Sequence, residues 1–215
     1  MGFIIAVDGP AASGKGTIAQ RLAAAYGLPM LDTGLLYRAV GVRILTAGGD
    51  LDDPAFAEAS ARGLDLAELE KPDVRTRAAG EAASRCAVHP GVRKALYDLQ
   101  RAFATQDAGA VIDGRDIGTV IAPEAPAKLY VTASPEVRAD RRWKQLVGQG
   151  ENVTYDEILA DIRKRDERDG GRKDAPMTQA ADAVLLDTSE MSIEQAFDAA
   201  RRIVEDARAH PKAHS

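Results

Sequence analysis

The chain has 215 residues, 45% of them hydrophobic and 28% charged, which is typical of a globular protein with a substantial buried core. The net charge of −5 argues against a nucleic-acid-binding protein, and no apolar run approaches the length of a membrane span. Cys86 is the single cysteine, so an internal disulfide is excluded and a reducing compartment fits; we expect a cytoplasmic protein without a leader segment.

The most informative segment lies near the start of the chain. Residues 3–8 form an apolar run that predicts a buried strand, and a helix is predicted over 14–26, with Ile18, Leu22 and Ala25 on its buried face. Glycine-rich backbone between a strand and a helix can point its N–H groups at phosphate oxygens. The sequence therefore predicts a phosphate-binding loop, or P-loop, formed by Gly9, Pro10, Ala11, Ala12, Ser13, Gly14, Lys15, Gly16 and Thr17.

This loop departs from the commonest pattern at one position. That pattern places Ser or Thr directly after the lysine, where the hydroxyl binds Mg²⁺, whereas here Gly16 follows Lys15 and Thr17 comes next. The GxxxxGKGT form is the one seen in nucleoside monophosphate kinases. A Mg²⁺ ion held mainly through water and ATP oxygens tolerates the change.

The rest of the chain alternates between short apolar runs and helical periodicity. Further strands are expected at 29–31, 110–112, 128–131 and 183–186. Further helices are expected from about 33, 53, 78, 90, 134, 154 and 192, with caps at Thr154 and Ser192, while residues 63–77 show no clear period. Continuously apolar strands between helices predict an α/β protein with a five-stranded parallel sheet and helices on both faces.

One domain is expected over 1–215, with its core at about 1–47, 78–143 and 154–208. Two excursions, about 48–77 and 144–153, leave this core in the manner of flaps over a cleft. The tail from about 209 to 215 is expected to be disordered.

Charged residues follow the predicted strands at the edge where an open α/β sheet binds ligands. They are Lys15 after the first strand, Asp32 and Arg38 after the second, Asp113, Arg115 and Asp116 after the third, and Arg138, Arg141 and Arg142 after the fourth. Guanidinium groups suit phosphate oxygens and neutralise charge during phosphoryl transfer. Asp113 stands where an acid would orient Mg²⁺ or its water molecules, the alternative being a turn cap.

The helix predicted over 154–169 has one informative face. Ile158, Ile162, Arg165 and Asp169 share that face, which is apolar at its start and charged at its end. The charged end is either solvated, or it directs Arg165, Asp169 and Arg172 into a cleft.

The remaining titratable residues give weaker signals. His89, His210 and His214 have no spacing typical of a metal site, and Cys86 is best explained as a small buried hydrophobe.

Six motifs together resemble the bacterial-type cytidylate kinases over nearly the whole chain. They are GPAASGKGT at 9–17, LDTGLLYR at 31–38, Ala83-Ser84-Arg85, Val92-Arg93, IDGRDIGT at 112–119 and RDERDGGR at 165–172. The P-loop alone indicates only a kinase, and the last two motifs are far more specific.

The resemblance implies a P-loop kinase that transfers the γ-phosphate of ATP·Mg²⁺ to CMP or dCMP, acting as a monomer in pyrimidine metabolism. Residues 9–17 would hold the ATP phosphates, with Mg²⁺ reached through water from Asp113 or Thr17. Residues 48–77 would be a shortened insert over the acceptor nucleotide, lacking the small sheet of better-known members, and 144–153 would be the lid.

The resemblance also implies roles for individual residues. Arg38, Arg115 and Arg165 would grip the acceptor phosphate; Ser84, Arg93 and Asp116 would read the cytosine edge; Asp169, with Arg165, would contact the ribose; Arg172 would lie near the transferred phosphate; and Thr33 stands where the family often has Ser. Lys15, Asp113, Arg115, Arg165 and Arg172 are the expected catalytic residues.

Three rival interpretations remain open from the residues. The first is another P-loop kinase, for a different nucleotide or an acceptor such as shikimate. The second is a nucleotide-dependent switch, which needs no arginine-rich acceptor site. The third, an RNA-binding or structural protein, is disfavoured by the acidic balance and the few aromatic residues.

Overall fold

A computed structural model describes residues 2–210. Its centre is one parallel sheet with the strand order β2-β3-β1-β4-β5. The strands are β1 (Ile4–Asp8), β2 (Met30–Asp32), β3 (Ala110–Gly114), β4 (Ala127–Thr132) and β5 (Val184–Asp187). The expected five-stranded parallel sheet is thus confirmed.

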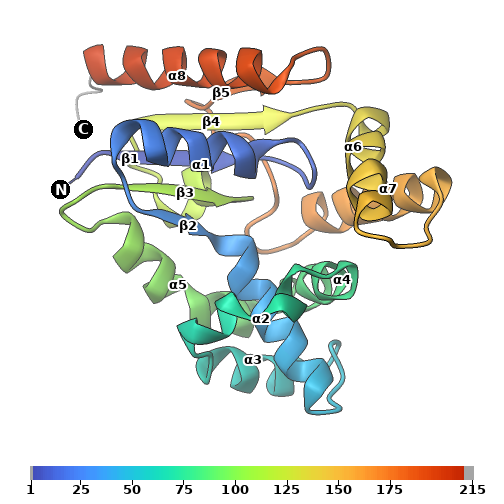
Figure 1. The fold of residues 1–215 in the computed structure, drawn as a ribbon. Helices are drawn as coiled ribbons and strands as arrows, with labels where there is room; N and C mark the ends of the chain where they lie inside the picture. Colours follow the sequence, from blue (N-terminus) through green and yellow to red (C-terminus); the bar gives the residue numbers. More distant parts are fainter. Residues whose placement is uncertain (1, 211–215) are drawn as a thin grey trace.

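Helices occupy most of the remaining chain (Figure 1). They are α1 (Lys15–Tyr26), α2 (Thr33–Thr46), α3 (Pro54–Arg62), α4 (Arg77–Cys86), α5 (Pro90–Ala104), α6 (Pro135–Gly148), α7 (Tyr155–Gly170) and α8 (Ile193–Ala209). Residues 63–77, which lacked a clear period, form two short 3₁₀ turns, Leu66–Glu70 and Pro72–Arg75. Residues Ile117–Ile121 form one wide helical turn, called here the 117–121 turn.

Apolar residues cover both faces of the sheet, as expected for a parallel sheet. On β1, Ile5 and Val7 face the layer made by α1 and α8. Ile4 and Ala6 face the opposite layer, made by the end of α5 and the 117–121 turn. Because strand side chains alternate between faces, Asp8 points toward the second layer.

One detail of α1 differs from the prediction. Ile18 and Leu22 are buried as expected, but Ala25 is exposed, and Ala19 and Ala23 complete the buried face. In the last turn of α1, Ala23 is buried and Tyr26 packs against the same cluster, so Ala25 lies on the outer side of the helix.

A second cluster of apolar side chains lies beyond the sheet, among α2, α3, α4 and α5. It includes Cys86, whose thiol is buried and whose pKa is raised by that burial to about 12. His89 is also buried here, with Nε2 2.8 Å from the carbonyl oxygen of Leu51. Cys86 is therefore a small buried residue of this cluster, in agreement with the sequence-based interpretation, and His89 contacts the backbone of the loop before α3.

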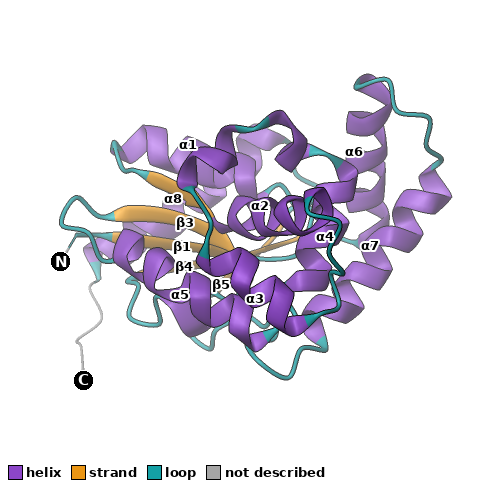
Figure 2. Cartoon of the chain, turned by 90° about the horizontal axis from the view of Figure 1, so that it is seen from below, coloured by secondary structure: helices purple, strands orange, loops and turns teal. Residues whose placement is uncertain are grey.

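Helices α6 and α7 stand at the carboxyl ends of the strands, opposite the N-terminus (Figures 1 and 2). The predicted cap of α7 is confirmed, since Thr154 Oγ1 accepts from Glu157 N at 3.3 Å and Glu157 Oε2 accepts from Thr154 N at 2.8 Å. After β3 the chain crosses β1 to form β4 on its other side. The loop after β1 thus lies where an open α/β sheet leaves a crevice for a ligand.

The last element of the described residues is α8. This helix runs through Ala209, at the start of the tail expected to be disordered, and residues 211–215 lie outside the described residues. Among the described residues, no helix combines the length and the apolar character needed to cross a bilayer.

Candidate active site

The P-loop has the backbone that a phosphate cradle requires. Gly9 has φ +145° and Gly14 has φ +90°, conformations that favour glycine. A Cβ at Gly9 would lie 1.9 Å from the carbonyl oxygen of Val131, so β4 also prevents any larger residue there. Ala12, with φ +61°, is left-handed without being glycine. No side chain caps the N-terminus of α1, so its first N–H groups remain available to an anion.

Two arginines of α6 hold the outer side of this loop. Arg138 Nη1 donates to the carbonyl oxygen of Ala11 at 3.3 Å, and Arg141 Nη1 donates to that of Ser13 at 3.4 Å. Thr188 Oγ1 donates to the same Ser13 oxygen at 2.9 Å. The carbonyls are therefore turned outward, which leaves the N–H groups to face inward. The predicted convergence of α6 arginines on the P-loop is confirmed.

Lys15 and Asp113 meet at the centre of this edge, with Lys15 Nζ 3.3 Å from Asp113 Oδ1. Burial lowers the pKa of Lys15, as does the charge of Arg115, and burial raises the pKa of Asp113. Gly16 lies against the same carboxylate, because a Cβ there would be 3.2 Å from Asp113 Oδ2. The glycine in the GKGT motif thus gives Asp113 the room to approach the P-loop.

A cavity of about 700 Å³ opens on the α1 and α8 side of the P-loop. Its polar walls are the P-loop, Arg141, Arg142 and Thr188, and its apolar walls include Met191 and Ile193. Ile193 is 55% exposed although it is apolar. Thr188, Met191 and Ile193 belong to no recognisable sequence motif. The return of the chain after β5 brings them beside the P-loop.

A second cavity, of about 720 Å³, lies between the P-loop, α4, α6 and α7. Arg38 and Arg165 line it, and their guanidinium groups approach Gly80 of α4 from two sides, within 3.1 and 3.6 Å of where a Cβ would be. Arg38 Nη1 also donates to the carbonyl oxygens of Val74 (3.1 Å) and Thr76 (3.0 Å). The turn before α4 therefore sets the position of Arg38.

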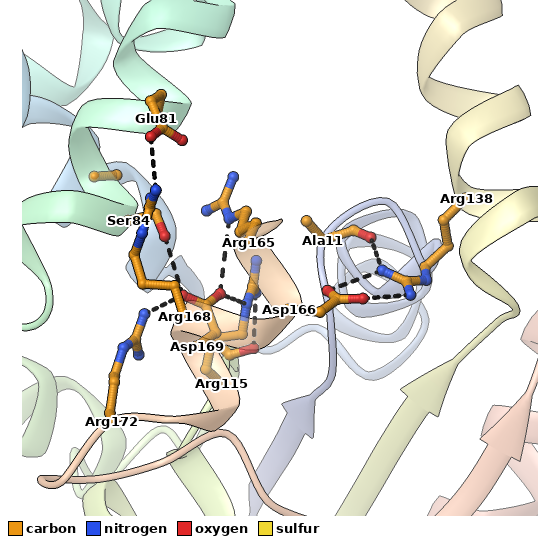
Figure 3. A network of polar contacts seen from close by, with 12 residues as sticks. Ala11, Glu81, Ser84, Arg115, Arg138, Arg165, Asp166, Arg168, Asp169 and Arg172 are labelled. Atoms are coloured by element: carbon orange, nitrogen blue, oxygen red, sulfur yellow. Dashed lines mark hydrogen bonds and ion pairs between the residues drawn. The ribbon is translucent and has the colours of Figure 1, made fainter. Parts of the chain in front are cut away.

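Asp169 gathers three arginines, one of which, Arg165, lines this second cavity (Figure 3). Arg115 Nε lies 3.3 Å from Asp169 Oδ2, Arg165 Nε lies 3.7 Å from it, and Arg172 pairs with Oδ1. Ser84 Oγ donates to Oδ1 at 3.2 Å. We call these five residues the Asp169 cluster. The charged end of α7 is therefore not solvated: Arg165 lines the cavity as predicted, whereas Asp169 and the side chain of Arg172 are buried behind it.

The charges in the Asp169 cluster are not balanced. Burial would raise the pKa of Asp169, but the charges of its arginine neighbours hold it below its usual value. Burial, together with the charge of Arg115, lowers the pKa of Arg165 to about 10. Three guanidinium groups share one carboxylate, which leaves excess positive charge at the end of the cavity. Such a site attracts an anion with several oxygens.

The other side of α7 is tied to the P-loop (Figure 3). Asp166 accepts from Arg138 Nη1 at 3.1 Å and from Nη2 at 2.6 Å, and the same Arg138 reaches Ala11. The helix that carries Arg165 and Asp169 is thereby fixed to the loop that faces it. Asp166 was not selected from the sequence, because its partner is 28 residues away on another helix.

Arg93 and Asp116 form a separate buried ion pair beside the Asp169 cluster. Thr33 is an expected substrate residue whose hydroxyl hydrogen is already used, since its Oγ1 donates to the carbonyl oxygen of Asp113 at 2.8 Å. It therefore fixes the end of β3 from α2. Asp8, which the sequence analysis left as part of the strand, is buried at the end of β1.

The geometry permits a phosphate-transfer site with two ligand positions, because both cavities are lined by Ala12, Arg142 and Gln145. The described residues contain no group of three or more His, Cys, Asp or Glu that could hold a metal ion by themselves. A metal at this site would need ligand or water oxygens in addition to protein groups.

Comparisons with known proteins agree with this geometry. A cytidylate kinase from Caulobacter sp. (strain K31) is 82% identical over 209 residues, 97% of each chain. One from Caulobacter vibrioides (strain NA1000 / CB15N) is 80% identical over 97% of this chain and 98% of its own. The solved structure of an uncharacterized protein from Eubacterium ventriosum ATCC 27560 has the same fold, with a TM-score of 0.57 and 13% identity over 98% of this chain and all of that one. The sequence profile of the family described as cytidylate kinase matches residues 5–206, so the chain belongs to the cytidylate kinase family.

Proposed function

We propose that this enzyme transfers the γ-phosphoryl group of ATP to CMP or dCMP, giving ADP and CDP or dCDP. The observation that carries the proposal is that two cavities meet at the P-loop, through Ala12, Arg142 and Gln145. The cavity beside α8 takes ATP, with its phosphates on residues 9–17. The cavity beside α4 and α7 takes the acceptor. A nucleotide switch would need only the first cavity.

The acceptor phosphate binds among Arg38, Arg115 and Arg165, and Arg172 lies near the phosphoryl group in transfer. This assignment rests on the excess positive charge around Asp169. Asp169 and Arg165 contact the ribose, which allows both CMP and dCMP. Thr33 acts through the backbone of Asp113.

Cytosine is read by Ser84, Arg93 and Asp116. Cytosine presents an amino donor beside a ring-nitrogen acceptor and a carbonyl. A carboxylate accepts from the amino group, while a guanidinium and a hydroxyl donate to the two acceptors. Uracil would present a carbonyl to Asp116, and the two acceptors would repel. This difference is the basis proposed for selecting CMP over UMP.

In the transfer step, an oxygen of the acceptor phosphate attacks the γ-phosphorus in line with the bond to ADP, which breaks as the new bond forms. No protein nucleophile is needed. Lys15 and the arginines neutralise the charge that the transferred group carries. Residues 48–77 and 144–153 close over the two nucleotides as insert and lid, which excludes the water that would otherwise hydrolyse ATP.

Mg²⁺ is the metal proposed to accompany ATP, and the residues present fit it. Asp113 is buried beside Lys15, its Oδ1 accepts no hydrogen bond within residues 2–210, and Thr17 lines the ATP cavity. Asp113 or Thr17 would hold the ion through water molecules. When bound, Mg²⁺ would neutralise phosphate charge and orient the γ-phosphate.

We further propose that the enzyme acts as a monomer in the cytoplasm and belongs to pyrimidine metabolism. It needs no nucleic-acid or membrane partner. The acidic net charge supports the exclusion of nucleic acid.

The test is an ADP-release assay with ATP·Mg²⁺ and a panel of acceptors: CMP, dCMP, UMP, AMP and shikimate. We expect turnover mainly with CMP and dCMP. Preferred turnover of AMP or shikimate would instead support one of the rival kinases. ATP hydrolysis without dependence on an acceptor would support a nucleotide switch, and would contradict the assignment of the second cavity.

A further inference from the structure

Asp8 joins the end of the central strand to the segment that carries Asp116. Its side chain is buried, with Oδ1 2.8 Å from Ile117 N and Oδ2 2.7 Å from Gly118 N. Both carboxylate oxygens are thus used by consecutive backbone donors. These donors belong to the two residues directly after Asp116, so Asp8 holds the backbone on which Asp116 is mounted.

The backbone of Asp116 is fixed from its other side as well. Its carbonyl oxygen accepts from Val120 N at 2.9 Å and from Ile121 N at 3.2 Å. The 117–121 turn is therefore closed on Asp116 and attached to Asp8 at two points. Among the hydrogen bonds made by the described side chains, the two from Ile117 N and Gly118 N to Asp8 are the ones that join the 117–121 turn to β1.

Asp8 is a rigid point of attachment. It lies on β1, which pairs with β3 on one side and with β4 on the other. The next residue, Gly9, is packed so closely against Val131 that a Cβ would lie 1.9 Å from its carbonyl oxygen. Since the strand cannot move independently, displacement after a change at Asp8 will occur in the turn, and Asp116 will move with it.

A carboxylate suits this role better than a neutral side chain. Two parallel N–H donors need two acceptors, and a carboxylate supplies both, whereas an amide supplies one oxygen and one donor group. The position is costly for a charge, because burial, together with the charges of Asp116 and Asp113, raises the pKa of Asp8 to about 7, although the hydrogen bonds from Gly118 N and Ile117 N lower it. The side chains of Lys128, beside Gly118, and of Tyr130 also face this group.

We propose that Asp8 is a positioning residue for base selection, which holds Asp116 in the orientation that accepts the cytosine amino group. This inference rests on the proposed function, in which Asp116 reads the base. Asp8 has no contact with the nucleotide. It couples the strand that ends at the P-loop to the residue that distinguishes cytosine from uracil.

The experiment compares kcat/KM for CMP and for UMP in the wild type, Asp8→Asn, Asp116→Asn and the double variant. We expect Asp8→Asn to lower the CMP:UMP ratio about tenfold or more while KM for ATP changes less than about threefold. In the double variant the ratio should equal that of Asp116→Asn, because Asp8 acts through Asp116. An unchanged ratio in Asp8→Asn, or additive losses in the double variant, would overturn the inference.

The matched control is Asp53→Asn. The carboxylate of Asp53 also accepts from two consecutive backbone donors, Ala55 N at 2.9 Å and Phe56 N at 3.2 Å, but it caps α3 away from Asp116. A lower melting temperature with an unchanged CMP:UMP ratio is expected there. An equal fall of the ratio in this control would show a general effect of lost stability, and would contradict the specific role of Asp8.

A second variant covers the case in which Asp8→Asn does not fold. Gly118→Ala keeps Asp8 but places a Cβ 3.3 Å from its Oδ2, which crowds the carboxylate. The CMP:UMP ratio should fall in this variant too, and an unchanged ratio would count against the inference. If the wild type shows no preference for CMP over UMP, the proposed function itself fails. If Asp116→Asn abolishes the preference but Asp8→Asn leaves it unchanged, the proposed function stands and the role of Asp8 fails.

Discussion

Arg93 and Asp116 pair with each other in a region almost closed to solvent, where each side chain is 7% exposed. Burial raises the pKa of Asp116 even though Arg93 lies against it. The ring of Tyr37 lies beside the guanidinium, with its centroid 5.8 Å from Arg93 Cζ. Two of the three residues proposed to read cytosine thus stabilise each other before a nucleotide arrives. A change to either one will affect both the fold and base recognition.

The first prediction concerns Asp116→Asn. Loss of the carboxylate leaves the buried Arg93 with the more distant Asp174, 3.8 Å from Nε and 57% exposed, as its acidic partner, which should lower the free energy of unfolding by about 3 kcal/mol. kcat/KM for CMP should fall about 100-fold, while KM for ATP changes by less than about threefold, because ATP occupies the other cavity. Steady-state kinetics with each nucleotide varied in turn, and urea denaturation, measure these effects.

A matched control for this variant is Asp52→Asn. Asp52 also pairs with an arginine, Arg85, but its side chain is 64% exposed. Its loss should cost less than about 1 kcal/mol and leave both KM values unchanged. Equal weakening of ATP and CMP binding in Asp116→Asn would remove Asp116 from base reading.

The second prediction concerns Asp169→Ala. Removing this carboxylate leaves the guanidinium groups of Arg115, Arg165 and Arg172 close together without their common partner. We expect the free energy of unfolding to fall by about 3 kcal/mol. Added inorganic phosphate should restore much of this loss, because an anion can take the place of the carboxylate. A thermal-shift titration with phosphate measures the restoration.

Asp161→Ala is the control for this titration. Asp161 lies on the same helix and pairs with Arg77, but its side chain is 51% exposed. Phosphate should stabilise this variant no more than the wild type. If phosphate stabilises Asp169→Ala no more than Asp161→Ala, the arginines of the Asp169 cluster do not form an anion site.

Much of this arrangement could be predicted from local sequence spacing. The P-loop follows from glycines and a lysine between a strand and a helix, and the face of α7 that carries Arg165 and Asp169 follows from helical periodicity. Each of these two signals depends on residues that lie close to one another along the chain. The parallel sheet is likewise indicated by apolar runs that alternate with helices.

What could not be predicted depends on contacts between distant segments. Asp8 is 109 residues from Ile117, and no spacing reveals that its side chain will meet that turn. The order of the strands belongs to the same class. It places β5 at an edge, where Leu185 is 54% exposed, although its apolar sequence resembles that of a buried strand. Met191, which follows this edge strand in the chain, lines the cavity proposed for ATP.

The third prediction concerns Gly16→Ala. The added Cβ would lie 3.2 Å from Asp113 Oδ2, so the carboxylate or the start of α1 must shift. Crowding of this kind costs about 1–3 kcal/mol, which corresponds to a fall in kcat/KM for ATP of about 5- to 150-fold. If Asp113 holds Mg²⁺ through water, the Mg²⁺ concentration for half-maximal activity should rise as well. Activity measured across a Mg²⁺ titration checks both effects.

Gly148→Ala is the control for Gly16→Ala. Gly148 is the last residue of α6, and a Cβ there would have no heavy atom within 4 Å. Because Gly148 lies within the proposed lid, its replacement is a control for the Mg²⁺ dependence alone, which should be unchanged. Unaltered kinetics in Gly16→Ala would show that the P-loop does not need Asp113 at its present distance.

The fourth prediction concerns the pH dependence of stability that arises from Asp8. Burial raises its pKa from the ordinary value of 3.8 to about 7. Between these two pH values the unfolded chain loses the proton of Asp8 while the folded protein keeps it. The unfolded state therefore binds fewer protons, and the contribution of Asp8 to the free energy of unfolding falls as the pH rises from 3.8 to about 7. Above pH 7 this contribution is constant.

The measurement is the melting temperature of the wild type and of Asp8→Asn at intervals from pH 4.5 to 8. Asn has no ionisable proton, so this contribution is absent from the variant, while the other acids titrate in both proteins. The melting temperature of the wild type minus that of the variant should therefore be most positive at pH 4.5, decrease toward pH 7 and then level off. A difference that stays level from pH 4.5 to 8 would mean that the hydrogen bonds from Ile117 N and Gly118 N outweigh burial and hold the pKa of Asp8 at or below its ordinary value.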